Sequence, residues 1–89
     1  MPTRTSASVL VECHAAGRTG IFLLGEHAAD RARERRIEID DIKHALRGAT
    51  AATLQDNGRW KVSGGLDLEG DAVTFIVMLE RGLLIVTLF

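Results

Sequence analysis

The stretch Gly25–Ile37 reads GEHAADRARERRI and predicts a short helix around which the rest of the chain is organised. Gly25 interrupts the apolar run before it, and Glu26 and Asp30 lie where the positive end of a helix dipole favours acidic side chains. The segment carries one histidine and four arginines, in a chain of 89 residues with a formal net charge of −1. It is therefore the densest cationic surface that the sequence offers, and the other segments are expected to hold it against a small sheet.

Further helices are expected on both sides of this segment. Residues 6–16 carry apolar side chains at helical spacing, and Gly17 is expected to end that helix. The four apolar residues 21–24 predict a short extended segment. The central helix is expected over 26–35, and a third over 39–47 has acids at its start and bases near its end.

The second half of the chain changes to the two-residue period of strands. Asn57-Gly58 is the strongest hairpin signal, and Gly64-Gly65 indicates a further turn. Residues 72–79 and 83–89 predict the last two strands. Because helices come first and strands follow, the sequence predicts one α+β domain over 1–89, with N-terminal helices packed on a three- to four-stranded antiparallel meander.

The last two predicted strands are apolar on both faces. In the final strand, Leu84, Val86 and Leu88 are expected to oppose Leu83 and Ile85. Either these are central strands buried on both sides, or one sheet face is a surface for a second chain. The second interpretation predicts a homodimer through the apolar sheet.

Composition narrows the class of protein. No apolar run approaches the roughly 20 residues of a membrane-spanning helix. The polar N-terminus has no secretory apolar core, and Cys13, the single cysteine, excludes an internal disulfide, so a cytoplasmic protein is expected. Because the net charge is near zero, any binding to nucleic acid must come from a local patch.

The candidate site combines the central helix with one strand. His27 and Arg31 stand four residues apart and share a helix face, and Arg35 continues the row. Arg59 and Lys61 alternate with apolar residues along a strand and leave it on the same side. If the two sets meet, a cleft forms with an acid–base imidazole and several cations, which is what metal-independent RNA cleavage needs.

A second interpretation of the same helix is a solvated face. Glu26, Asp30 and Glu34 lie within reach of the arginines and would neutralise them, as charge runs on helices usually do. No metal site is expected, because Cys13 and the three histidines lack the spacing of metal ligands, and no cofactor is implied.

One motif resembles a known family. The pattern His27-Ala28-x-x-Arg31-x-x-x-Arg35-x-Ile37, followed by Asp41-Ile42 and Ala45-Leu46, is similar to a widespread group of small bacterial proteins of unassigned function. Members of that group resemble the MqsR toxins, which are mRNA interferases with a RelE-like fold. The resemblance implies the toxin of a type II toxin–antitoxin pair, which cleaves free or ribosome-bound mRNA and is inhibited by a zinc-finger or helix-turn-helix antitoxin.

The resemblance also assigns roles to the candidate residues. MqsR uses a tyrosine at its site, and this chain has none. Catalysis would therefore rest on His27 as the general acid or base and on Arg31 and Arg35 as phosphate binders, with Arg59 and Lys61 as RNA contacts. Two alternatives remain: a non-catalytic interaction module or inactive toxin relative that binds a partner or itself, and a small sensor that uses the histidines.

Overall fold

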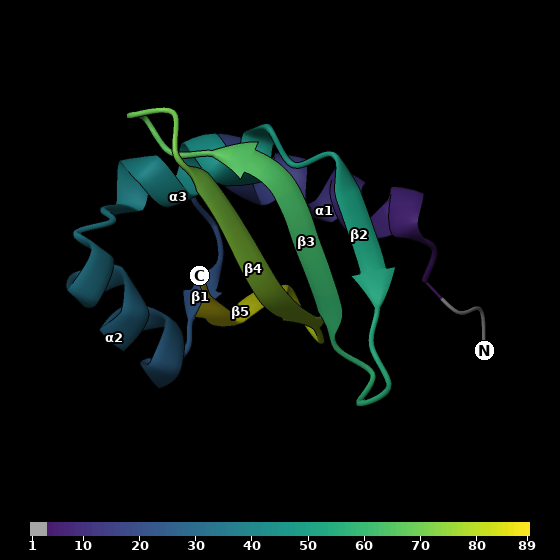
Figure 1. The fold of residues 1–89 in the computed structure, drawn as a ribbon. Coiled ribbons are helices and arrows are strands. Elements are labelled where there is room, and N and C mark those ends of the chain that lie inside the picture. Colours follow the sequence, from purple (N-terminus) through teal and green to yellow (C-terminus); the bar gives the residue numbers. More distant parts are fainter. Residues whose placement is uncertain (1–3) are drawn as a thin grey trace.

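The computed structural model describes residues 4–89 and contains three helices and five strands (Figure 1). The α+β class is confirmed, as are the bounds expected for the second and third helices. The elements in chain order are α1 (Ser6–Thr19), β1 (Leu23–Leu24), α2 (Glu26–Arg35), α3 (Ile39–Arg47), β2 (Ala51–Leu54), β3 (Trp60–Leu66), β4 (Ala72–Leu79) and β5 (Leu83–Leu88).

The five strands form one mixed sheet in the order β1-β5-β4-β3-β2. Strands β2 to β5 form an antiparallel meander, and β1 adds to its edge in parallel to β5, with Leu23 opposite Leu84 and Leu24 opposite Ile85. The expectation of three to four antiparallel strands was therefore incomplete. A two-residue segment is too short to indicate its partner, and that partner lies at the other end of the sequence.

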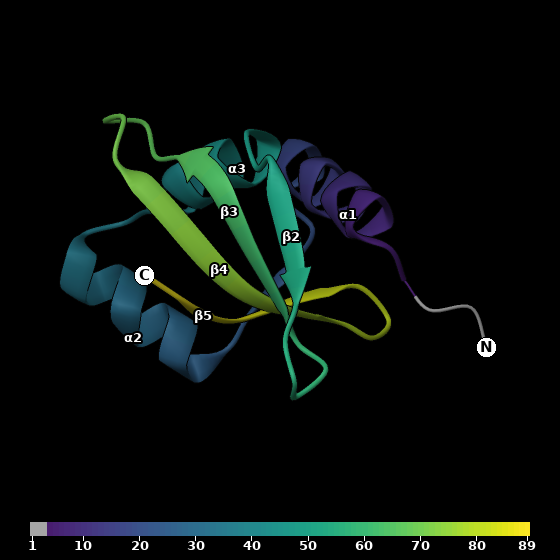
Figure 2. The same cartoon turned by 45° about the vertical axis from the view of Figure 1, so that its right-hand side comes forward.

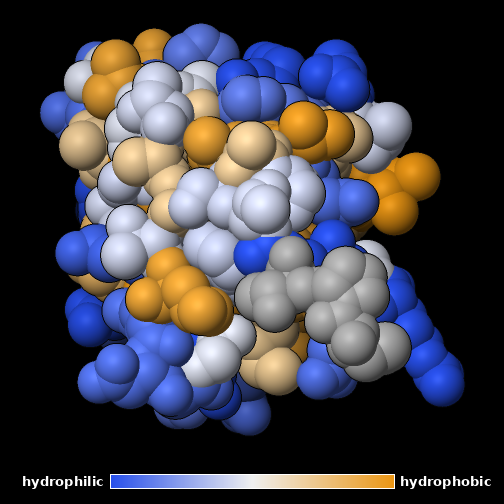
Figure 3. Space-filling view, turned by 90° about the vertical axis from the view of Figure 1, so that its right-hand side faces the viewer, coloured by the Kyte–Doolittle hydropathy of each residue, from blue (hydrophilic) through white to orange (hydrophobic). Residues whose placement is uncertain are grey.

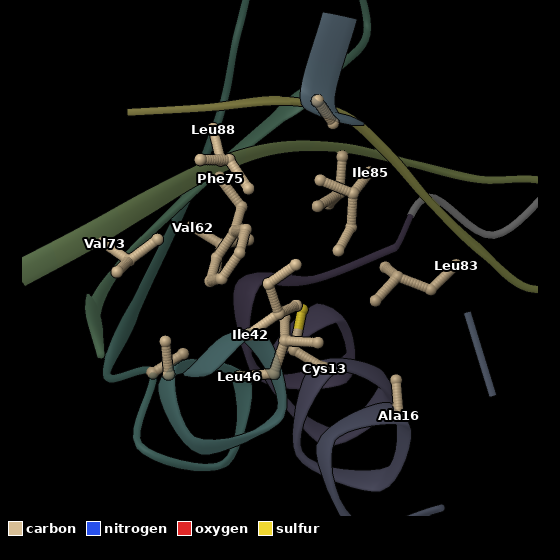
Figure 4. Packing of buried hydrophobic residues seen from close by; sticks show 14 of the residues in the cluster. Cys13, Ala16, Ile42, Leu46, Val62, Val73, Phe75, Leu83, Ile85 and Leu88 are labelled. Atoms are coloured by element: carbon tan, nitrogen blue, oxygen red, sulfur yellow. The ribbon is translucent and has the colours of Figure 1, made fainter. Parts of the chain in front are cut away.

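Helices α1 and α3 pack against each other and cover one face of the sheet, while α2 lies beside β5 (Figures 1 and 2). The core between the α1–α3 pair and the sheet is made of fully buried aliphatic and aromatic side chains (Figure 4). Its largest members are Phe75, Ile42, Leu46, Ile85 and Leu88. The opposite face of the sheet has no helix of this pair over it and is called the open face below.

The sequence predicted that Gly17 ends the first helix, and this prediction was wrong. The helix continues to Thr19 and ends at Gly20, whose φ of 74° is left-handed and whose N–H donates to the carbonyl oxygen of Ala16. Gly17 is buried inside the helix, where a Cβ would lie 2.7 Å from the carbonyl oxygen of Lys43. The glycine is therefore required for the close approach of α1 and α3.

Gly64-Gly65 is not a turn either. Both residues lie within β3, at a register shift against β4 between Val62 and Gly65. A Cβ on Gly65 would come 1.9 Å from the carbonyl oxygen of Ala45, so the strand passes under α3 at a distance that only glycine permits. The glycine pair therefore marks a bulge and a close backbone contact.

A second irregularity changes the faces of β5. Ile76 pairs with Thr87 and Val77 with Ile85, so Val86 has no partner in this register. The extra residue brings Leu88 to the same buried side as Ile85, rather than to the opposite side as alternation had predicted. Thr87 consequently lies on the open face.

The surface combines polar residues with small apolar groups. On the side that carries the edge strand β2, hydrophobic residues form several separate groups between polar ones (Figure 3). No helix within residues 4–89 combines the length and the apolar character needed to cross a bilayer.

Candidate functional site

A cleft of about 380 Å³ opens between α2, the β2–β3 hairpin and the last strand. It is where the histidine and two of the arginines singled out in the sequence come together. Its lining residues are His27, Asp30, Arg31 and Glu34 from α2, Arg59 from the β2–β3 hairpin, and Val86 and Thr87 from β5.

Local sequence explains why α2 is held against β5. Gly25 is the N-cap, and its N–H donates a hydrogen bond of 2.8 Å to the carbonyl oxygen of Ile85. On the buried side of the helix, Ala28 and Ala32 are 0% and 6% exposed. Because alanine is small, the helix axis can approach the strand closely. The charged side chains of α2 that line the cleft therefore lie beside Val86 and Thr87 of β5.

The helix presents Glu34, rather than Arg35, beside His27. At about 100° per residue, Arg31 is rotated about 40° from His27 and Arg35 about 80°, whereas Glu34 is only about 20° away on the other side. Arg35 accordingly lies outside the cleft lining, and its Nη2 donates to the carbonyl oxygen of Ala72 at 3.3 Å. Of the predicted row of three residues, His27 and Arg31 therefore line the cleft and Arg35 does not.

Of the two strand cations, Arg59 lines the cleft and Lys61 lies outside it. Arg59 lines it directly, at the base of a hairpin closed by a 2.8 Å hydrogen bond from Gln55 N–H to its carbonyl oxygen. Lys61 is exposed and pairs across the sheet with Ile76, which pairs with Thr87. Cross-strand partners share a face and neighbouring strands lie about 4.8 Å apart, so Lys61 stands about 10 Å from Thr87, outside the cleft.

One of the three arginines of α2 forms an ion pair with a neighbouring acid in the part of the chain that the structure describes. Within residues 4–89 the single ion pair joins Arg33 to Asp30, both on α2. The solvated-face interpretation therefore holds for Arg33, while Arg31 and Arg59 face the cleft. Glu34 was expected only to neutralise the arginines, although its seven-residue spacing from His27 indicated a shared helix face.

The side chains of the other two histidines form hydrogen bonds with backbone carbonyl groups outside the cleft. His14 Nε2 lies 2.7 Å from the carbonyl oxygen of Ala49, and His44 Nδ1 lies 2.7 Å from that of Leu66. Cys13 is fully buried in the core, and this burial, with the nearby charge of Glu12 adding to it, raises the pKa of its thiol to about 12. Among the residues that the structure describes, no three histidine, cysteine or carboxylate side chains gather as metal ligands.

Comparisons of the chain with protein-family models, with curated proteins and with solved structures return no match. The geometry of the cleft is therefore what supports a functional proposal.

Proposed function

We propose that the chain is a metal-independent endoribonuclease that acts on mRNA in the cytoplasm as the toxin of a type II toxin–antitoxin pair. The observation that carries this proposal is the convergence of His27, Arg31, Glu34 and Arg59 in one open cleft. The set contains two groups able to transfer protons and two cations, held by a helix and a hairpin that come from distant parts of the sequence. The proposal includes a RelE/MqsR-like fold and inhibition by a cognate antitoxin of the zinc-finger or helix-turn-helix type.

These side chains match the demands of RNA cleavage by the neighbouring hydroxyl. A base removes the proton of the 2′-hydroxyl, O2′ attacks phosphorus, and an acid donates a proton to O5′ as the P–O5′ bond breaks. The products are a 2′,3′-cyclic phosphate and a 5′-hydroxyl. His27 and Glu34 supply the two proton-transfer groups. Arg31 and Arg59 stabilise the additional negative charge that develops on the phosphorane oxygens.

Induced expression tests this proposal. The wild type is expected to arrest growth and to leave cleaved mRNA, whereas His27→Ala is expected to do neither. Arg18→Ala is the matched control for an exposed cation outside the cleft, because Arg18 lies in the last turn of α1. Equal toxicity of the wild type and His27→Ala, or no toxicity in either, would overturn the assignment of His27. Purified wild-type protein is expected to cleave RNA in the presence of a metal chelator.

A second candidate function, a non-catalytic module that binds a protein partner, is favoured by one observation. Ile21 and Leu23 are 77% and 70% exposed beside a hollow of about 350 Å³ formed with the β4–β5 turn. Because neighbouring exposed apolar side chains that line a hollow are typical of contact surfaces, the β1 edge is the place proposed for an antitoxin-like partner. If this were the main function, Leu23→Asp would abolish the growth phenotype and His27→Ala would leave it unchanged.

A further inference from the structure

Phe89 presents an aromatic ring on the open face of the sheet. Of the four aromatic residues, Phe75 and Trp60 are 0% and 8% exposed and Phe22 packs against the core, whereas Phe89 is 48% exposed. The backbone of Phe89 pairs with that of Thr74 through hydrogen bonds of 2.7 and 2.8 Å. Because the preceding Leu88 is fully buried on the core side, the ring of Phe89 lies on the opposite side, which is the open face.

The ring lies next to the cleft along the same strand. Thr87, which lines the cleft, precedes Phe89 by two residues and shares its face. At about 3.4 Å per residue, the two positions are about 7 Å apart. A nucleotide whose phosphate is held by Arg31 and Arg59 therefore has a neighbour within reach of the ring.

Helix α2 extends past this ring. Its start is tethered to β5 by the 2.8 Å hydrogen bond from Gly25 to Ile85, and its end by the 3.3 Å hydrogen bond from Arg35 to Ala72. Ala72 precedes Thr74, the partner of Phe89, by two residues, so Arg35 lies beyond Phe89 as seen from the cleft. Figures 1 and 2 both show α2 beside the end of β5. The cleft, the ring and Arg35 thus follow one another along α2.

We propose that Phe89 is a base-stacking platform for the nucleotide next to the scissile phosphate, and that Arg35 contacts the backbone beyond it. This inference rests on the proposed function, since it extends the RNA site of that cleft. An aromatic ring stacks on any base, because every base has a π-face. The surface formed by the cleft, Phe89 and Arg35 is therefore expected to select single-stranded over paired RNA, and not one particular sequence. It also gives Arg35 a role in binding that its place outside the cleft would otherwise leave without explanation.

Fluorescence anisotropy with a labelled single-stranded hexanucleotide tests the platform. The probe carries 2′-deoxyribose, so that cleavage cannot occur. Phe89→Ala is expected to weaken binding about 5- to 150-fold, the range measured for loss of one base–aromatic stack, and Phe89→Trp to retain it. Leu68→Ala is the matched control, because Leu68 is 60% exposed in the β3–β4 turn. The backbone hydrogen bonds to Thr74 do not depend on the ring, so these variants keep the strand pairing.

A second probe separates stacking from charge. On a hexanucleotide that lacks its bases, Phe89→Ala and the wild type are expected to bind equally, while Arg35→Gln is expected to weaken binding to both probes. If the wild type binds the complete probe and Phe89→Ala binds it equally well, the platform is overturned while the RNA cleft stands. If the wild type binds neither probe and cleaves no RNA, the proposed function fails and the platform fails with it.

Discussion

Arg47 Nη1 donates a hydrogen bond of 3.0 Å to the carbonyl oxygen of Gly17, at the point where α3 crosses α1. At the same crossing a Cβ on Gly17 would lie 2.8 Å from the backbone nitrogen of Arg47 and 2.7 Å from the carbonyl oxygen of Lys43. Two backbones thus meet at a distance that no other residue type permits, and the α1–α3 layer that supports the sheet depends on it.

Gly17→Ala is therefore expected to destabilise the fold. Alanine would favour the helix by about 1 kcal/mol, but overpacking against rigid backbone costs about 1–3 kcal/mol, so a net loss of about 1 kcal/mol is expected. Urea unfolding followed by circular dichroism measures the change. Ala15→Gly on the same helix measures the difference in helix propensity between alanine and glycine without the close backbone contact. A Gly17→Ala variant more stable than the wild type would contradict the close contact.

Arg36→Gly is expected to stabilise the protein. Arg36 caps α2 with φ of 56°, a left-handed conformation that costs a non-glycine residue about 1–2 kcal/mol, partly offset by the greater freedom of glycine in the unfolded chain. A net gain of about 0.5–1 kcal/mol in the free energy of unfolding should appear in thermal or urea denaturation. Arg35→Gly, one residue earlier and inside the helix, should instead lower stability, and equal effects of the two changes would refute this account.

Asp41 is expected to make stability depend on pH in the acidic range. Its carboxylate accepts hydrogen bonds of 3.0 Å from the N–H groups of Glu38 and Leu68, and these bonds lower its pKa. Because the folded pKa is the lower one, the stabilisation is fully present above the unfolded value of about 3.9 and is lost as the pH falls through the folded pKa.

Asp41→Asn should accordingly unfold at a lower urea concentration than the wild type at pH 7, and the difference should shrink as the pH is lowered below about 4. Asp40→Asn is the control, since Asp40 also lies in the first turn of α3 and loses the same charge. A difference for Asp41→Asn that stays constant from pH 7 to pH 2 would show that the hydrogen bonds to the carboxylate are not its source.

Cys13 is expected to be unreactive in the folded protein. With a pKa of about 12, raised by burial, the thiolate is on the order of one molecule in ten thousand at pH 8. Ellman's reagent should therefore label the native protein very slowly and label it at once in guanidinium chloride. Rapid labelling of the native protein at pH 8, with its circular dichroism unchanged, would place the thiol outside the core.

The sequence was a good guide to features that are local. Residues 26–35 and 39–47 were predicted as helices because their polarity pattern and flanking breakers lie within the segments themselves. Gly17 and Gly65 were misread as stops and turns, because what requires them is a backbone that arrives from another part of the chain. The bulge at Val86 and the parallel pairing of β1 are likewise decided by the partner strand.

In the site, too, the local features could be predicted from the sequence and the features that depend on distant segments could not. That His27 and Arg31 share a face is a property of the helix alone, but the presence of Arg59 in their cleft depends on how the sheet places the β2–β3 hairpin. The alternation of Arg59 and Lys61 placed both on one side without showing which of them would reach α2. Arg35 was grouped with His27 by counting in fours, although a helix turns about 40° too far with each such step.

The division between Glu34 and Arg35 gives the sharpest test of the cleft, because the two residues are adjacent and differ in the role expected of them. Glu34 lines the cleft, whereas Arg35 donates to Ala72 outside it. Glu34→Gln is expected to lower kcat for RNA cleavage by about 10²–10⁴, the contribution of a proton-transfer group, with little change in KM. Arg35→Gln is expected to raise KM with kcat unchanged, because it removes a contact made equally in the ground and transition states.

Glu26→Gln is the matched control for the lost carboxylate, since Glu26 opens the same helix outside the cleft. Steady-state cleavage of a short fluorogenic RNA gives kcat and KM separately. Should Glu34→Gln change only KM, or should Glu26→Gln lower kcat as much, then Glu34 acts through the charge of the helix and His27 must find its proton-transfer partner elsewhere. Should Arg35→Gln lower kcat instead, then the reacting phosphate lies further along α2 than the cleft.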